Sequence, residues 1–334
     1  MATFRRTQEI EHEIGESGEL SLRVTDPDVE MRGGDGSVAR VRVRFEIRAA
    51  SDAVADEIFD RLRYHVRDAV GSLEVAEPRH GLSDSIGSLA RLVGIGSGKA
   101  DVSVEVDAPR SCDLYYNGVS SDLTTGGFQA RQQYRTVSGD LVLDNIGGEL
   151  RVNGVSGDIS LRASAPLTAL EISTVSGDIS AIAPRIEHLR ATTVSGDVEV
   201  EGTLAAGPEH RIETVSGDLS LGVADHLSVE VRGLSTDVDI RLPHRSEGSR
   251  DRRRYIIGDG TVQLLFSSMS GDIEVRPPRR SASLPPPTPP PPPVPRPPTA
   301  DATEEMAILR ALERGEIGVD EATRRLAGER PADG

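Results

Sequence analysis

The fold class of this 334-residue chain is decided by the stretch Leu170-Glu-Ile-Ser-Thr-Val-Ser-Gly-Asp-Ile-Ser-Ala181. Its central tetrapeptide, Val-Ser-Gly-Asp, occurs five times in the chain, and three related tetrapeptides flank the run. The eight copies begin at Val119, Val137, Val155, Val175, Val194, Val215, Leu234 and Met269. Successive copies start 18 to 21 residues apart, except for a last step of 35. Self-similarity at this period predicts a solenoid, in which each coil buries its apolar face against neighbouring coils.

The apolar residues keep a fixed register around each tetrapeptide. Counted from its first residue, they recur at positions −5, −3, 0, +4 and +6, and in one coil these are Leu170, Ile172, Val175, Ile179 and Ala181. Even separations on each side of the turn predict strands with their apolar side chains on one face. Eight coils stacked about 4.8 Å apart would extend for roughly 38 Å. We therefore expect an all-β fold, a parallel β-helix or β-solenoid, that Val175→Asp would disrupt.

Composition narrows the class of protein further. The net charge is −16, from 38 basic and 54 acidic residues, which disfavours nonspecific binding to nucleic acid or to an anionic membrane. The single cysteine, Cys112, permits no intrachain disulfide, and we expect it to be buried as a small apolar residue. No secretion signal or membrane span is visible, so we expect a cytoplasmic protein. A cell-surface role and a peripheral association with the cell envelope stay open.

Residues 1–99 are expected to form a β-rich segment with one helix. Charged residues alternate with apolar ones in Val41-Arg-Val-Arg-Phe-Glu-Ile-Arg48, which predicts a half-buried strand. Ser51 resembles an N-cap, and apolar residues at helical spacing after it predict a helix at about 52–70. Farther along, Gly94-Ile-Gly-Ser-Gly-Lys99 lacks two residues of a Walker phosphate loop. We expect an apolar loop or a short helix there, without a nucleotide site.

The solenoid is expected to occupy residues 100–276, and the 35-residue step indicates an insertion within it. The extra length falls at about 243–254, in a loop rich in arginine. Such a loop could hold a phosphate or an acidic partner, although a solvated loop beside acidic neighbours is the simpler interpretation. The candidate partner-binding residues in it are Arg250, Arg252, Arg253 and Arg254.

Two further segments follow the solenoid. Thirteen of the 21 prolines lie between residues 277 and 298, which predicts a stiff polyproline II linker over 277–300, or else a ligand for proline-reading domains. Residues 301–334 are expected to form a helical hairpin that is too small to fold alone and serves in docking or self-association. Its candidate partner-binding residues are Leu309, Leu312, Ile317 and Leu326.

One aspartate per coil would form a column of carboxylates. The five full repeats contribute Asp140, Asp158, Asp178, Asp197 and Asp218. Such a column could bind a row of Ca²⁺ ions, or each carboxylate could accept hydrogen bonds from the amides of its own turn. We expect the second role, because one carboxylate per coil supplies few ligands and the calcium-binding nonapeptide repeat is absent. No cofactor or metal is expected.

The coils resemble those of the DUF4097 family, the bacterial "putative adhesin" β-solenoids. The resemblance rests on the repeats, on Val102-Ser-Val-Glu-Val-Asp-Ala-Pro109 before them, and on Gly258-Asp-Gly260 ahead of Met269-Ser-Gly-Asp-Ile273. The tail Ile308-Leu-Arg-Ala-Leu-Glu-Arg-Gly-Glu-Ile-Gly-Val-Asp-Glu-Ala322 is similar to SHOCT-type oligomerisation modules. The resemblance implies adhesion or, as in relatives tied to cell-envelope stress responses, sensing or scaffolding.

Three functions are compatible with these features. The first is a non-enzymatic β-solenoid for binding or scaffolding, whose C-terminal helices recruit a protein partner or another copy of the chain. The second is a filament-forming β-helix similar to bactofilins. The third is a carbohydrate-active enzyme, which we do not expect, since the seven histidines are scattered and the irregular coil lacks paired carboxylates.

Overall fold

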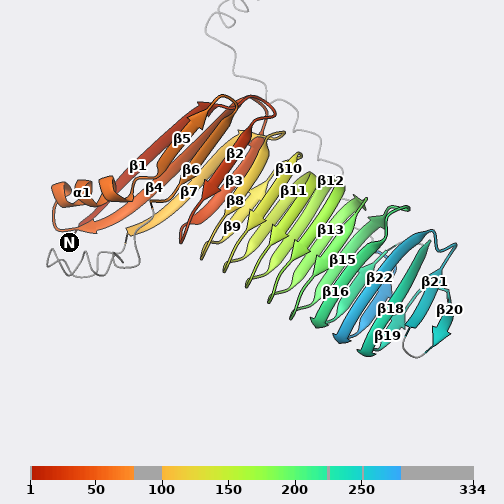
Figure 1. Ribbon diagram of the computed structural model, residues 1–334. Helices are drawn as coiled ribbons and strands as arrows, with labels where there is room; N and C mark the ends of the chain where they lie inside the picture. The colour runs from red at the N-terminus through yellow and green to blue at the C-terminus, as the bar shows by residue number, and fades with distance from the viewer. Residues whose placement is uncertain (1, 79–99, 224–225, 250–251, 280–334) are drawn as a thin grey trace, which may run out of the picture. The chain divides into compact units, whose positions relative to one another are not determined.

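The computed structural model describes residues 2–78, 100–223, 226–249 and 252–279. Residues 1–279 form one compact unit, an all-β solenoid that carries a single helix in its described part. Its strands pair in two ladders, which we call A and B, and β11 and β12 run through both ladders (Figure 1). The fold class expected from the repeats is confirmed.

Ladder A holds the strands that precede each Val-Ser-Gly-Asp corner. In order of pairing it consists of β5 (His65–Ala69), β6 (Ser72–Ala76), β2 (Glu19–Arg23), β8 (Asp113–Asn117), β10 (Arg131–Arg135), β11 (Leu141–Asn153), β12 (Ile159–Ser173), β14 (Leu189–Thr192), β16 (His210–Ser216), β22 (Val262–Ser270), β18 (Leu227–Ser235), β21 (Arg252–Ile257) and β20 (His244–Ser249). From β6 to β18 the pairing is parallel, as a solenoid requires.

Ladder B holds the strands that follow each corner. In order of pairing it consists of β1 (Ala2–Glu13), β4 (Val38–Ala49), β7 (Ala100–Pro109), β3 (Asp28–Gly34), β9 (Leu123–Gly126), β11, β12, β13 (Ile179–Ile186), β15 (Val198–Leu204), β17 (Leu219–Gly222), β23 (Ile273–Arg276) and β19 (Val238–Ile240). The side chains that point inward from both ladders form one apolar core.

The core confirms four of the five register positions. In the coil around Val175, the residues Leu170, Ile172, Ile179 and Ala181 are at most 1% exposed. Position 0 is different: Val175 is 48% exposed. Because alternate residues of a strand face opposite sides, Thr174 at position −1 continues the inward series, and Val175 must point outward. The prediction that this valine is buried is therefore wrong, and burial no longer gives a reason to expect that Val175→Asp would disrupt the stack.

The order of the coils in space departs from their order in sequence at both ends. Strands β22 and β23 lie between the coil of Val215 and the coil of Leu234, although they follow both in the chain (Figure 1). At the other end, β2 and β3 lie between the pair β6 and β7 and the pair β8 and β9. Both ends of the stack are thus interleaved.

Helix α1 (Asp52–Leu62) packs on β4 and β1 at the N-terminal end of ladder B. Ser51 is its N-cap, as predicted, and accepts a hydrogen bond from the Val54 amide at 3.4 Å. The helix ends eight residues before the predicted limit of 70, which is a correction. Residues 65–69 instead form β5, which pairs with β6 across a tight turn at Gly71, where φ is +78°.

The arginine-rich insertion is a β-hairpin, and the expected loop is corrected accordingly. Strands β20 and β21 pair antiparallel, and β21 also pairs antiparallel with β18 at the end of ladder A. The hairpin therefore covers the edge that β18 would otherwise expose. The segment 82–99, most of the proline-rich segment and the expected helical hairpin lie outside the described residues. Within the described part, no helix is long and apolar enough to cross a bilayer.

Candidate functional site

The Val-Ser-Gly-Asp corner is a compact turn whose third residue is glycine in six of the eight copies, with Ser121 and Thr236 in the other two. Gly177 has a φ of +118°, in the left-handed region that L side chains rarely adopt. A Cβ atom there would also lie 2.2 Å from the carbonyl oxygen of Gly157 in the neighbouring coil. Successive corners thus stack in direct backbone contact, and the residues around the glycine form columns along the stack.

The first column is apolar and lies on the surface. We call it the valine ridge, and its members are Val119, Val137, Val155, Val175, Val194, Val215 and Met269. Each is between 43% and 57% exposed. Single exposed apolar residues are ordinary on protein surfaces, but seven in one column form a continuous apolar strip. The valine ridge is the largest apolar feature among the exposed residues that the structure describes.

The second column is the aspartate ladder, three residues farther along each coil. Its members in stacking order are Asp122, Asp140, Asp158, Asp178, Asp197, Asp218, Asp272 and Asp237. The Oδ1 atom of each of the first seven accepts a hydrogen bond from the backbone N–H of the next aspartate at 2.8–2.9 Å. The aspartates therefore link neighbouring coils, whereas we expected them to cap their own turns.

The aspartate ladder borders a cleft on the outer face of ladder B. The cleft has a volume of about 790 Å³ and is lined by six of the aspartates together with Glu199, Glu274 and Arg279. Arg279 places Nη2 3.2 Å from Oε1 of Glu199. Within the described ranges, none of the aspartates of the ladder forms an ion pair. The described residues also contain no group of three or more side chains suited to hold a metal ion.

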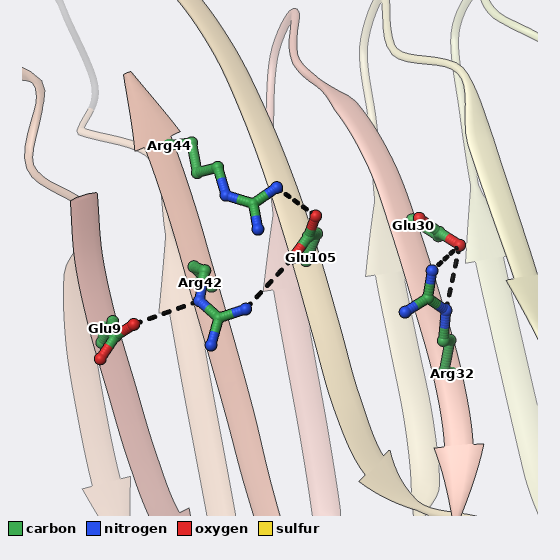
Figure 2. Close-up of polar contacts among 6 residues, drawn as sticks. All are labelled: Glu9, Glu30, Arg32, Arg42, Arg44 and Glu105. Atoms are coloured by element: carbon green, nitrogen blue, oxygen red, sulfur yellow. Dashed lines mark hydrogen bonds and ion pairs between the residues drawn. The ribbon is translucent and has the colours of Figure 1, made fainter. Parts of the chain in front are cut away.

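The N-terminal part of ladder B has a different charge pattern. Figure 2 shows that Arg42 lies between Glu9 and Glu105 on neighbouring strands, with distances of 3.2 Å and 3.4 Å. Arg44 pairs with the same Glu105, and Arg32 on β3 pairs with Glu30. Glu9, Glu30 and Glu105 are therefore neutralised by arginines. Unpaired acidic charge is concentrated farther along, beside the valine ridge.

The arginines of the hairpin hold it to the last coil. Arg253 donates from Nη2 to the carbonyl oxygen of Thr236 at 2.6 Å, and Arg254 pairs with Glu230 at 2.9 Å. Arg252 belongs to β21, while Arg250 lies outside the described residues. The candidates Leu309, Leu312, Ile317 and Leu326 also lie outside them. Three of the eight predicted partner-binding residues thus lie on β21, and the other five lie outside the described residues.

The Toastrack DUF4097 family matches residues 17–276 of the sequence. The chain belongs to this family. Similar solved structures include a "putative lipid binding protein" from Parabacteroides distasonis, a "putative adhesin" from Bacteroides fragilis and a "putative cell adhesion protein" from Clostridium sporogenes. Their identities to the DUF4097 chain are 14%, 10% and 10%, and their TM-scores are 0.41, 0.35 and 0.25. Each match covers 81% of the chain and 96%, 97% and 99% of the other structure, respectively. No curated protein matches the sequence.

The reactive side chains of this DUF4097 protein serve its core. Cys112 is fully buried, as predicted, and burial raises the pKa of its thiol to about 12, so the thiol is not a nucleophile at neutral pH. His210 is also buried. It accepts a hydrogen bond from the Leu189 amide at Nδ1, and its Nε2 lies 2.8 Å from the carbonyl oxygen of Ala205. Both ring nitrogens are therefore engaged in structural contacts.

Two features of the DUF4097 corner were missed by sequence reasoning. The exposure of the valine ridge follows from the odd separation between positions −3 and 0, which the pattern already contained. Thr25-Asp26-Pro27-Asp28 is a further corner, because Leu20 and Leu22 precede it and Val29 and Met31 follow it in the same register. Its divergence from Val-Ser-Gly-Asp concealed it.

Proposed function

We propose that this DUF4097 protein is a non-enzymatic binding and scaffold protein, with the valine ridge as its binding surface. The observation that carries the proposal is the row of seven half-exposed apolar side chains at one position of the corner. The turn does not need an apolar residue there, because the side chain points away from the core. Burial against a partner accounts for the column, since exposed apolar strips of this kind mark interaction sites.

The remaining parts of the chain complete this proposal. The sequence favours residues 277–300 as a spacer and residues 301–334 as the element that recruits a partner or another copy of the chain. In this arrangement the solenoid of residues 1–279 binds one component and the tail binds another, as a sensor or scaffold of cell-envelope stress would require. The cytoplasmic location stays a prediction.

The filament hypothesis has less support than binding. Head-to-tail growth of a solenoid needs open end coils that can pair with the next copy. At the N-terminal end, α1 packs on β1 and β4, and at the other end the hairpin of β20 and β21 covers β18. An enzymatic function has no supporting site among the described residues.

The test is a pull-down from a native extract with three baits. They are the full chain, a chain that ends at residue 300, and a full-length variant with Val155, Val175 and Val194 changed to Ser. We expect one set of proteins to be lost with the ridge variant and another to be lost with the truncated chain. If the ridge variant retains every protein that the full chain retains, the ridge is not the binding surface. Light scattering of the same baits reports filament growth.

A further inference from the structure

The spacing of the valine ridge selects the conformation of a chain that can lie along it. The ridge presents one apolar side chain per coil, about every 4.8 Å. A strand repeats its facing residues about every 6.8 Å, which matches neither one coil nor two. An α-helix makes one turn every 5.4 Å, so over the six steps of the ridge its facing residues move about 3.6 Å out of register with the coils. A polyproline II helix repeats every three residues, or about 9.3 Å, which is close to the spacing of two coils. Over six coils its facing residues move only about 0.9 Å out of register.

The aspartate ladder selects the charge of the same partner. It runs beside the valine ridge, three residues farther along every coil. Oδ1 of each aspartate except the last, Asp237, is engaged with the next coil, and Oδ2 has no protein partner within the described ranges. A row of carboxylates repels acidic ligands and a second copy of the same corner, and attracts Arg or Lys.

A guanidinium group of the chain itself shows that the cleft accepts this chemistry. Arg279 lies at the cleft with Nη2 3.2 Å from Glu199, and its side chain is still 70% exposed. The neighbouring Arg276 also pairs with Glu199, at 2.8 Å. Neither arginine pairs with an aspartate of the ladder, so the carboxylates of Asp158 and Asp178 have no cationic partner among the described residues.

We propose that the valine ridge and the aspartate ladder together bind a polyproline II segment of another protein that carries Arg or Lys. Apolar residues of the segment contact the ridge at every second coil, and its basic side chains face the aspartates. This inference rests on the proposed function and deepens it, because it names the partner's conformation and charge.

The binding test uses fluorescein-labelled (Pro-Pro-Arg)4, which spans about 37 Å as a polyproline II helix. The controls are (Pro-Pro-Glu)4 and a helical Leu/Lys peptide of the same length and net charge as the first. Fluorescence anisotropy is recorded with the full chain, and with a full-length variant in which residues 280–298 are replaced by a Gly-Ser linker of equal length. We expect saturable binding of (Pro-Pro-Arg)4, and at least about tenfold weaker binding of both controls.

Surface variants then locate the site on the solenoid. V155S/V175S/V194S removes apolar contact from the ridge, and its matched control V66S/V70S changes two exposed valines at the N-terminal end of ladder A. D158N/D178N/D197N removes three charges but keeps an Oδ1 acceptor for the amide of the next coil. We expect the ridge variant to lose about tenfold in affinity, the matched control to bind like the unaltered chain, and the Asn variant to lose most of the salt dependence.

The outcomes separate this inference from the proposed function. Absence of (Pro-Pro-Arg)4 binding to both chains, or equal binding of the helical peptide, overturns the polyproline II partner. Equal losses in the ridge variant and its matched control also overturn it. If the ridge variant still loses proteins in the pull-down, the proposed function survives that failure. Thermal unfolding of each variant at or above the temperature of the unaltered chain excludes misfolding as the cause.

Discussion

At the scale of single residues, the burial of the side chains at positions −1 and 0 depends on their distance from the inward-facing residue at position −3. An even number of residues places the side chain in the core, and an odd number places it at the surface. Thr174 at position −1 is 4% exposed, and its hydroxyl donates to the carbonyl oxygen of Ser176 at 3.2 Å. In the coil of Leu234 the buried hydroxyl comes from Thr236, and Gly233 takes position −1, where a Cβ would lie 2.1 Å from that hydroxyl. Each of these two corners thus has room for one inward hydroxyl side chain.

The difference between inward and outward positions can be measured in one coil. We expect Ile179→Ala to lower the free energy of unfolding by about 2–5 kcal/mol, because it leaves a cavity in the core. Val175→Ser should change it by no more than about 0.5 kcal/mol, because Val175 points into solvent. Urea denaturation of the two variants checks this. Equal losses of unfolding free energy in the two variants would mean that Val175 is buried, as the apolar pattern predicts.

The aspartate ladder makes a second prediction at this scale. Asp178→Ala removes the acceptor of the Asp197 amide and should cost about 0.5–1.5 kcal/mol of unfolding free energy. Asp178→Asn keeps an oxygen at the same place and removes one of a row of like charges, so we expect it to match or exceed the stability of the unaltered chain. Denaturation at low and high salt tests both. An Asn variant as unstable as the Ala variant would contradict this account.

His210 predicts a pH dependence of stability. Burial lowers its pKa below 6.5, because the core disfavours the charged ring. Between the lowered pKa and about 6.5, the unfolded chain binds a proton that the folded chain does not. The contribution of the neutral ring is therefore complete above pH 6.5 and falls as the pH drops below it. We expect the stability difference between the unaltered chain and His210→Gln to shrink from pH 7.5 to pH 5.5, as measured by urea denaturation.

At the scale of elements, the sequence predicted regular strands well and the end of the helix poorly. Val66 and Ala69 continue the helical spacing that follows Ser51, but they belong to β5. The tight turn at Gly71 lets that strand pair with β6, and local periodicity cannot report such a pairing. Gln8 instead fixes the chain after α1, since its side chain bonds both the amide and the carbonyl group of Tyr64.

The hairpin of β20 and β21 gives the prediction at this scale. If a short Gly-Ser linker replaces residues 244–257, the edge of β18 is uncovered. Exposed strand edges pair with other chains, so we expect association that increases with concentration, as seen by light scattering. Arg254→Ala is the matched control, because it removes only the ion pair with Glu230 and should leave the chain in its original state of association. If both variants associate, the loss of the Arg254 charge explains the association, and the uncovered edge of β18 does not.

At the scale of the whole unit, the repeat period predicted the stack but not its order. The sequence places the coil of Met269 last, and nothing in its register distinguishes an end coil from an inner one. The hydrogen bonds of Asp272 show where this coil lies. Its backbone N–H donates to Oδ1 of Asp218, and its Oδ1 accepts from the backbone N–H of Asp237. The candidate site was hidden for a related reason, because the valines were counted with the core.

Hydrogen exchange tests the inner position of this coil. We expect the amides of residues 262–276 to exchange as slowly as those of residues 198–221, because both segments have paired strands on either side. The amides of β20, at the end of ladder A, should exchange much faster. Fast exchange throughout residues 262–276 would place this coil at the end of the stack.

The interleaved ends have a consequence for synthesis on the ribosome. A simple solenoid can be completed coil by coil as the chain emerges, but this one cannot. Strands β2 and β3 pair with β8 and β9 only after the chain has been made as far as residue 126. At the other end, the coil of Leu234 is made before residues 262–276, which must then insert between it and the coil of Val215. Until then each partly made end presents unpaired strands, which are prone to aggregate. A newborn chain of this kind should therefore depend on chaperones longer than its regular repeats suggest.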